Sequence, residues 1–143
     1  MNLEDVVPII GHAVLHYTKP DGTIGWVRTL RNGVTIEGCN WLLDTMFRGG
    51  TQSPLIYAGL VNSAAYSAVN SLDTHALHAG WTEFSGLLSA TRPIWTPAAA
   101  VGGLMGTTAA ASFSIAADGF IRGVFLSNIS AVGSTAPGIL YNT

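Results

Sequence analysis

The sequence predicts a mainly β protein, an antiparallel β-sandwich of jelly-roll type with one short α-helix at about residues 36–48. Two observations lead to this fold class. Several short runs of β-branched and aromatic residues are separated by Gly, Pro and Asp-Gly turn signals, and only one stretch has the spacing of an amphipathic helix. Seven or eight short strands divided in this way are typical of sandwiches and jelly rolls.

The first predicted element is a hairpin. Residues 13–18 and 23–30 are rich in β-branched and aromatic types, and Lys19-Pro20-Asp21-Gly22 lies between them. Proline followed by Asp-Gly favours a chain reversal through its allowed backbone angles. Asn32-Gly33 then predicts another tight turn, which would end the second strand.

The predicted helix follows this turn. Its apolar residues recur at the i, i+3, i+4, i+7 and i+8 spacing of one buried face, and two glycines then provide a stop signal. The residues expected on that buried face are Cys39, Leu42, Leu43, Met46 and Phe47.

The rest of the chain predicts further strands. Residues 55–61 form a near-continuous apolar run, which favours a buried central strand. Residues 62–80 are small and polar without a period, and a loop of this length suggests a functional or partner-contacting segment. Asp118-Gly119 is the clearest two-residue hairpin signal. The additional strands are expected at 81–88, 90–96, 110–116, 119–127 and 139–141.

Length and composition limit the function classes. The 143 residues predict one domain, residues 9–143, preceded by an N-terminal arm, residues 1–8. Charged residues make up 10% of the chain, well below the roughly 25% of an ordinary soluble domain, so we expect neighbours to cover part of the surface. The net charge of −2 and the scattered basic residues argue against nucleic-acid binding.

Targeting and redox signals point to the cytoplasm. No apolar run approaches the roughly 20 residues of a membrane-spanning helix, and acidic residues stand where an export signal has positive charge. The lone Cys39 has no partner for an internal disulfide, which fits a reducing compartment. We therefore expect no membrane association. We expect assembly to take place in a reducing cytoplasm.

The candidate chemistry is sparse, and we expect no enzyme activity and no cofactor. A nucleophile elbow and a phosphate-binding loop are both missing from the sequence. A metal site would need Asp73, His75, His78 and Glu83 to converge around one ion. The preferred interpretation is that these polar side chains cap and solvate a loop. His12 and His16 share one strand face and are expected on the surface.

The four tryptophans suggest two different roles. Trp41 belongs to the helix and Trp81 begins a predicted strand, so we expect both to be buried. For Trp26 and Trp95 the sequence allows two positions, either in the core or on an exposed surface that stacks on sugars.

Four segments resemble small structural proteins of tailed bacteriophages. They read NWLLDTMF at 40–47, LIYAGLVN at 55–62, LDTHALHAGWTEF at 72–84 and ATRP at 90–93. In that group an N-L-L-type helix and a glycine-containing loop precede a Y-x-G-L strand, and D-T-x-x-x-H-A-G-W-x-E and A-x-R-P elements follow. The resemblance covers about residues 38–93, and the chain is therefore similar to capsid decoration (cement) proteins.

The resemblance implies a virion structural role on the capsid exterior. The expected partners are the major capsid protein and other copies of the chain, as a dimer or trimer. Members of the group are also tail or fibre components, so the alternative is a tail-fibre or tail-tip protein that binds host carbohydrate. A small lytic or metal-dependent enzyme is a more distant alternative. The residues expected to contact partners are Leu3, Val6, Val7, Tyr66, Asp73, His75 and His78.

Overall fold

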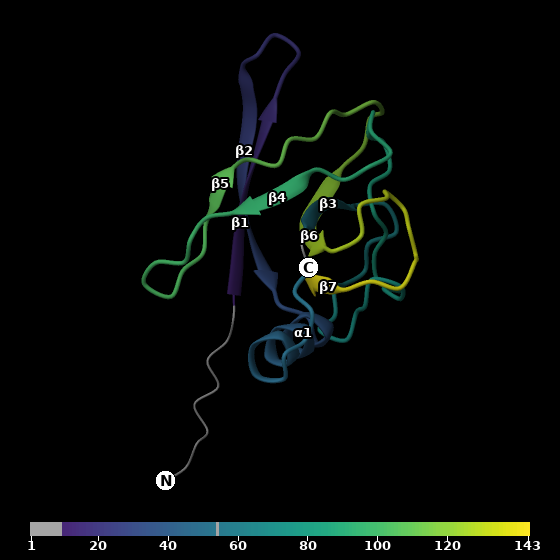
Figure 1. The fold of residues 1–143 in the computed structure, drawn as a ribbon. Coiled ribbons are helices and arrows are strands. Elements are labelled where there is room, and N and C mark those ends of the chain that lie inside the picture. Colours follow the sequence, from purple (N-terminus) through teal and green to yellow (C-terminus); the bar gives the residue numbers. More distant parts are fainter. Residues whose placement is uncertain (1–9, 54) are drawn as a thin grey trace.

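A computed structural model describes residues 10–53 and 55–143 (Figure 1). The two sheets are a two-stranded sheet, β1-β2, and a five-stranded sheet in the order β5-β4-β3-β6-β7, with antiparallel pairing throughout. A mainly β, antiparallel fold with one helix is thus confirmed, whereas the jelly-roll sandwich is not. The elements are β1 (Ile10–Thr18), β2 (Ile24–Gly33), α1 (Ile36–Phe47), β3 (Ile56–Asn62), β4 (Ile94–Pro97), β5 (Thr107–Ala109), β6 (Ile121–Ser127) and β7 (Leu140–Asn142).

The five-stranded sheet is built around β3, as the apolar run at 55–61 predicts. β3 lies between β4 and β6, and its residues 58–61 are buried. Gly59 pairs with Phe125 of β6, and a Cβ at this glycine would overlap the Phe125 ring. The absence of a side chain therefore lets the ring cross β3. The core consists of Val61, Trp81, Phe125 and Leu140, with Tyr66 packed against it.

The β1–β2 hairpin forms around the predicted turn at 19–22. The amide of Gly22 donates to the Lys19 carbonyl over 2.9 Å, and Gly22 has a φ of 83° that suits glycine. The predicted turn at Asn32-Gly33 is wrong, because both residues continue β2 and pair with β1. Asn32 is buried, and its side-chain amide donates to the Val124 carbonyl over 3.0 Å. This bond joins the base of the hairpin to β6.

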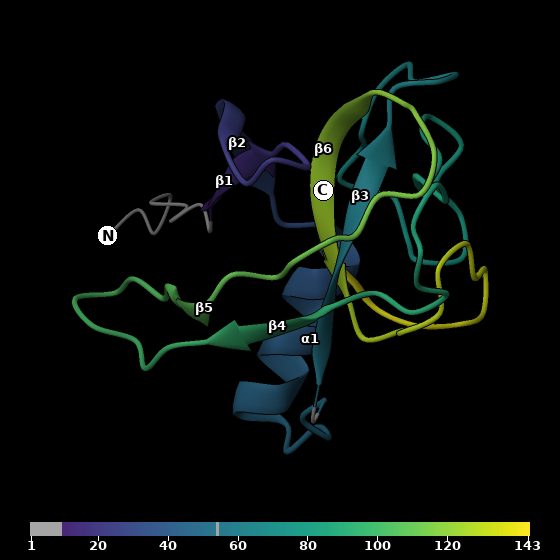
Figure 2. The same cartoon turned by 90° about the horizontal axis from the view of Figure 1, so that it is seen from above.

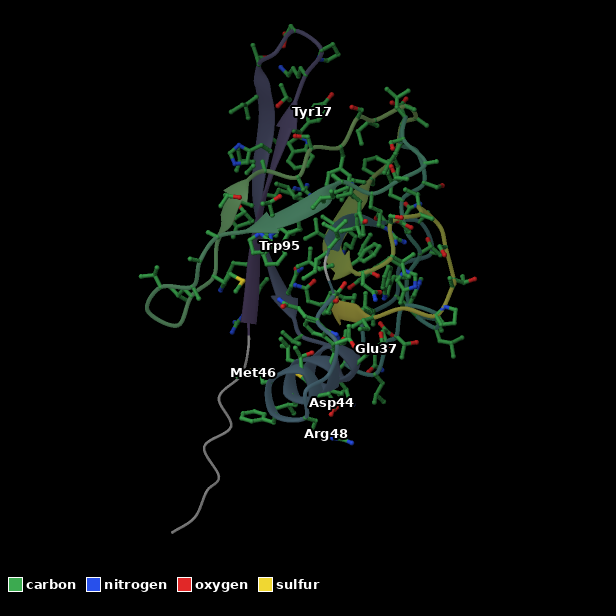
Figure 3. All side chains as sticks on the ribbon, in the orientation of Figure 1. Tyr17, Glu37, Asp44, Met46, Arg48 and Trp95 are labelled. Atoms are coloured by element: carbon green, nitrogen blue, oxygen red, sulfur yellow. The ribbon has the colours of Figure 1, made fainter. Side chains whose placement is uncertain are left out.

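The helix α1 begins at the Thr35 cap, whose hydroxyl accepts from the Gly38 amide over 3.0 Å. Its predicted buried face is wrong at the C-terminal end, since Leu43, Met46 and Phe47 are 54%, 71% and 74% exposed. The helix packs on β7 mainly through its first turns. The apolar residues of its last turns therefore extend beyond the sheet, as Met46 shows in Figure 3.

Several predicted strands do not form. Residues 81–88 contain only isolated bridges, because Trp81 and Phe84 are both buried and a strand would place them on opposite faces. The strand expected at 110–116 is also wrong, since β5 ends before it and only an isolated bridge joins Ile115 to Leu87. Asp118-Gly119 therefore closes no hairpin. The strand expected at 90–96 begins only at Ile94.

Residues 1–8, the predicted N-terminal arm, lie outside the described residues, and the single domain at 9–143 stays a prediction. Within the described ranges, no helix has the length and apolar character needed to cross a membrane.

Candidate functional site

Residues 63–93 are described throughout and contain no strand. Buried side chains hold this segment instead. We call His75, Glu83 and Arg92 the Arg92 cluster, because the other two side chains meet at the Arg92 guanidinium. Buried backbone and side-chain polar groups require hydrogen-bond partners, so such a cluster can order an irregular segment as a strand ladder would.

The Arg92–Glu83 pair is the centre of the cluster. Arg92 Nε donates to Glu83 Oε1 over 2.7 Å and Nη2 donates to Oε2 over 2.8 Å, which is the bidentate geometry that suits guanidinium and carboxylate. Their side chains are 2% and 6% exposed. The guanidinium also lies 5.1 Å from the centre of the Phe125 ring, so the pair is seated directly on the core.

His75 is locked in one protonation state by its two neighbours. Its Nδ1 lies 2.9 Å from the Ala136 carbonyl oxygen, and its Nε2 lies 3.3 Å from Arg92 Nη1. A carbonyl only accepts and a guanidinium only donates, so Nδ1 carries the proton and Nε2 accepts. Burial lowers the pKa of His75 below 6.5, the nearby Arg92 charge lowers it further, and the Ala136 bond opposes both.

Two further carboxylates anchor the segment that carries the cluster. Glu37 Oε2 accepts from the His75 amide over 3.1 Å and from the Leu140 amide over 2.6 Å. Glu37 thereby ties the first turn of α1 to both the loop and β7. Asp73 Oδ2 accepts from Trp81 Nε1 over 2.9 Å, which satisfies the one polar atom of this buried indole.

A small cleft opens beside the cluster. The His78 ring stacks on Trp81 with centroids 3.9 Å apart, and this pair forms one wall. The cleft has a volume of about 270 Å³, near the lower limit of the roughly 300–1,000 Å³ of small-molecule sites. Its lining includes His75, His78, Trp81, Thr82, Glu83, Ser85, Arg92, Ser134 and Thr135.

The four residues that a metal site would need do not converge on one point. His75 and Glu83 meet, but the Arg92 guanidinium lies between them in the place that an ion would take. Asp73 faces Trp81, and His78 Nδ1 donates to the Trp81 carbonyl over 3.0 Å. Within 10–53 and 55–143, no group of three His, Cys, Asp or Glu side chains has an arrangement that could hold a metal.

The predicted contact residues differ in accessibility. Asp73 and His75 are 8% and 3% exposed, so in this conformation they support the loop from inside. His78 and Tyr66 are half-buried, and the Arg122 guanidinium lies 5.0 Å from the Tyr66 ring centre. Leu3, Val6 and Val7 lie outside the described residues. Their contacts with a partner stay predictions.

A second candidate site is the exposed apolar surface of two projecting segments. The β1–β2 hairpin extends beyond the five-stranded sheet, and the β4–β5 arm, residues 94–109, extends in another direction (Figures 1 and 2). At the arm's tip Gly102 and Gly103 have φ values of 60° and 77°, as a tight two-residue turn requires. The exposed apolar residues are Val14, Tyr17, Ile24, Trp26 and Val27 on the hairpin, and Ile94, Val101, Leu104 and Met105 on the arm.

The aromatic predictions have mixed outcomes. Trp81 is buried, as expected, while Trp41 is half-buried and packs edge-on against Tyr141 with centroids 4.9 Å apart. Trp26 is 40% exposed and stacks on Tyr17 at 5.6 Å, and Trp95 is half-buried on β4. His12 and His16 are exposed, which confirms their surface position.

Two central residues were missed by sequence reasoning. The sequence pattern assigns no site role to Arg92, which lies in the ATRP segment, or to Glu37, which lies in the first turn of α1. The available signal for Arg92 was a single cation within a long, nearly uncharged region, with Glu83 nine residues before it. A lone charge in such surroundings is buried only when it is paired.

Comparisons with known proteins add no relative: no protein-family model, no curated protein and no solved structure matches the chain.

Proposed function

We propose that the chain is a virion structural protein of a tailed bacteriophage, a decoration protein that binds the outside of the capsid and stabilises its shell. Its partners would be the major capsid protein and further copies of itself, with assembly in the bacterial cytoplasm. The observation that carries this proposal is the set of exposed apolar side chains on the hairpin, the β4–β5 arm and the end of α1. Exposed apolar patches of this kind are typical of protein interaction sites.

The buried polar groups support a structural role over a catalytic one. Both Glu83 oxygens bind Arg92, and one of them also accepts from the Gly133 amide. Both ring nitrogens of His75 are engaged as well. Groups held in this way stabilise the loop, whereas a general acid or base must reach a substrate proton.

The end of α1 is the proposed shell-facing surface. Leu43, Met46 and Phe47 are exposed there beside the weak surface pair of Arg48 and Asp44. Leu3, Val6 and Val7 are further proposed contacts from the sequence. A jelly-roll sandwich, the fold that the resemblance implies, also stays a proposal.

Co-sedimentation with undecorated, expanded capsids tests the proposal. We expect saturable binding in a fixed ratio to capsid subunits, and Phe47→Glu should weaken it by about tenfold or more because a charge enters an apolar contact. Leu88→Glu is the matched control, since Leu88 and Phe47 are each 74% exposed and Leu88 lies outside the predicted contact residues. Wild-type protein that stays in the supernatant would overturn the capsid role.

The second candidate is a tail-fibre or tail-tip protein that binds host carbohydrate. The observation that favours it is the stack of Tyr17 on Trp26 at the hairpin tip, where each residue is 40% exposed, because aromatic faces stack on sugars. Saturable binding on a glycan array that Trp26→Ala abolishes would establish this candidate. A blank array would leave the capsid role as the only proposal.

A further inference from the structure

The β1–β2 hairpin buries little of its own surface. Its strands of 9 and 10 residues reach about 30 Å, and almost every residue of β2 is exposed. The rest of the chain holds it mainly at its base, through Asn32 and through the bonds between Gly33 and Thr143. An isolated two-stranded sheet is marginal in water, so a covered face would stabilise this one.

The whole chain exposes more surface than a compact monomer does. Its accessible surface is 9515 Å², whereas a monomer of 14.9 kDa exposes about 7,000 Å². Subtracting the about 1,500 Å² that an unfolded stretch of nine residues exposes leaves about 8,000 Å², which is still about 1,000 Å² more than a compact monomer exposes. Stable interfaces bury about 800 Å² on each partner, so the excess is sufficient for an oligomer.

Charge favours a neighbouring copy as the occupant. The described hairpin, residues 10–33, carries Lys19, Arg28 and Arg31 against Asp21 alone, a net charge of +2. The described residues from 34 onward carry three basic and five acidic residues, a net charge of −2. Two hairpins would repel each other, whereas a hairpin and the body of another copy attract.

The β4–β5 arm is the part of the body best suited to the hairpin. Residues 94–117 contain no charged residue, so covering the arm desolvates no charge. Val101 and Leu104 at its tip are each 77% exposed. On the hairpin, Tyr17, Trp26 and Arg28 form a stacked group, with the Arg28 guanidinium 5.4 Å from the Trp26 ring centre, and these residue types dominate interface hot spots.

We propose that the β1–β2 hairpin of one copy packs on the β4–β5 arm of another, and that this contact holds the copies together in a closed oligomer. Because the contact joins two different surfaces, it can be made reciprocally by two chains or head to tail around a ring. The inference deepens the proposed function by defining how copies of the decoration protein would meet.

The mass of the purified protein, measured by light scattering at tens of micromolar without capsids, tests this contact. We expect at least twice 14.9 kDa. Val27→Glu on the hairpin, where Val27 is 50% exposed, and Leu104→Glu on the arm should each raise the dissociation constant by about tenfold or more. The control Leu88→Glu, where Leu88 is 74% exposed against 77% for Leu104, should leave the mass unchanged. Circular dichroism melts check that each variant is folded.

Mixing the two defective variants separates the proposed contact from a hairpin-to-hairpin contact. Val27→Glu keeps an intact arm and Leu104→Glu keeps an intact hairpin, so one good contact remains and the mixture should contain two-chain complexes. A monomeric wild type would overturn the proposal, as would a Leu104→Glu variant that keeps the full mass. A stable oligomer that fails to bind capsids would overturn the capsid role alone.

Discussion

Arg92→Met keeps most of the length of the side chain but leaves the Glu83 carboxylate buried without its counter-charge. Breaking a buried ion pair in this way typically costs about 3–5 kcal/mol. We expect a loss of this size in the free energy of unfolding, measured by urea denaturation. The control is Arg48→Met, which removes an exposed pair with Asp44 and should cost about 0–1 kcal/mol. Equal losses in the two variants would contradict the role given to Arg92.

The stability of the fold should depend on pH through His75. Burial lowers the pKa of His75 below 6.5 in the folded chain, while the unfolded chain keeps the ordinary value. Well above pH 6.5 the residue is neutral in both the folded and the unfolded chain, so its protonation does not lower the free energy of unfolding. As the pH falls through 6.5, the unfolded chain takes up a proton that the folded chain does not, so stability is lost by at most about 1.4 kcal/mol per pH unit.

Unfolding free energies at about pH 7.5 and about pH 5.5 measure this effect. His75→Gln should make the difference between the two conditions smaller, because the titrating group is removed. Asn40→Gln, which changes an exposed residue that does not titrate, should leave the difference as in the wild type. A His75→Gln protein with the wild-type pH dependence would show that another group is responsible.

Sequence reasoning reached part of the buried site. It singled out Asp73, His75 and Glu83 as a polar group, and the structure places His75 and Glu83 in one cluster. It did not find Arg92, because the ion pair joins residues on either side of an irregular segment and no strand or helix period relates them. The sequence also did not predict that this group is buried, since polar side chains in a loop are more often solvated.

At the scale of elements, Gly38 determines how α1 docks on the sheet. A Cβ at Gly38 would overlap the backbone of Tyr141, including its carbonyl oxygen. Gly38→Ala should therefore reduce the free energy of unfolding by about 1–3 kcal/mol, as overpacking does, although alanine favours a helix. Gly33→Ala is the control, because nothing lies within 4 Å of a Cβ there. Denaturant melts that show no loss for Gly38→Ala would contradict this docking.

Three elements that local chemistry predicts are confirmed by the structure, whereas the turn signals at Asn32-Gly33 and Asp118-Gly119 are not. The turn at 19–22, the helix at 36–47 and the apolar strand β3 each depend on signals within a few residues. The strand at 81–88 failed because its hydrophobic residues serve two different contacts, with Trp81 on Phe125 and Phe84 against Gly119. Long-range packing of this kind leaves no period in the sequence.

At the scale of the whole molecule, the low charge and the projecting hairpin and β4–β5 arm are the features on which the proposed coverage by neighbours depends. The low share of charged residues, 10%, predicts that neighbours cover part of the surface. It does not predict which part, because that depends on how far the hairpin and the β4–β5 arm project from the core. The exposed end of α1 is a second example. An amphipathic pattern predicts that an apolar helix face will be covered, but not whether the covering surface belongs to the same chain.

The melting temperature of undecorated, expanded capsids, measured by calorimetry with and without saturating protein, tests the structural role most directly. A ligand that binds only the intact shell stabilises it by about 2.7 kcal/mol per site at a hundredfold excess over the dissociation constant. We predict a clear rise in the capsid melting temperature that saturates at a fixed ratio of protein to capsid subunit. An unchanged capsid melting temperature, with the added protein still folded at that temperature, would contradict the account.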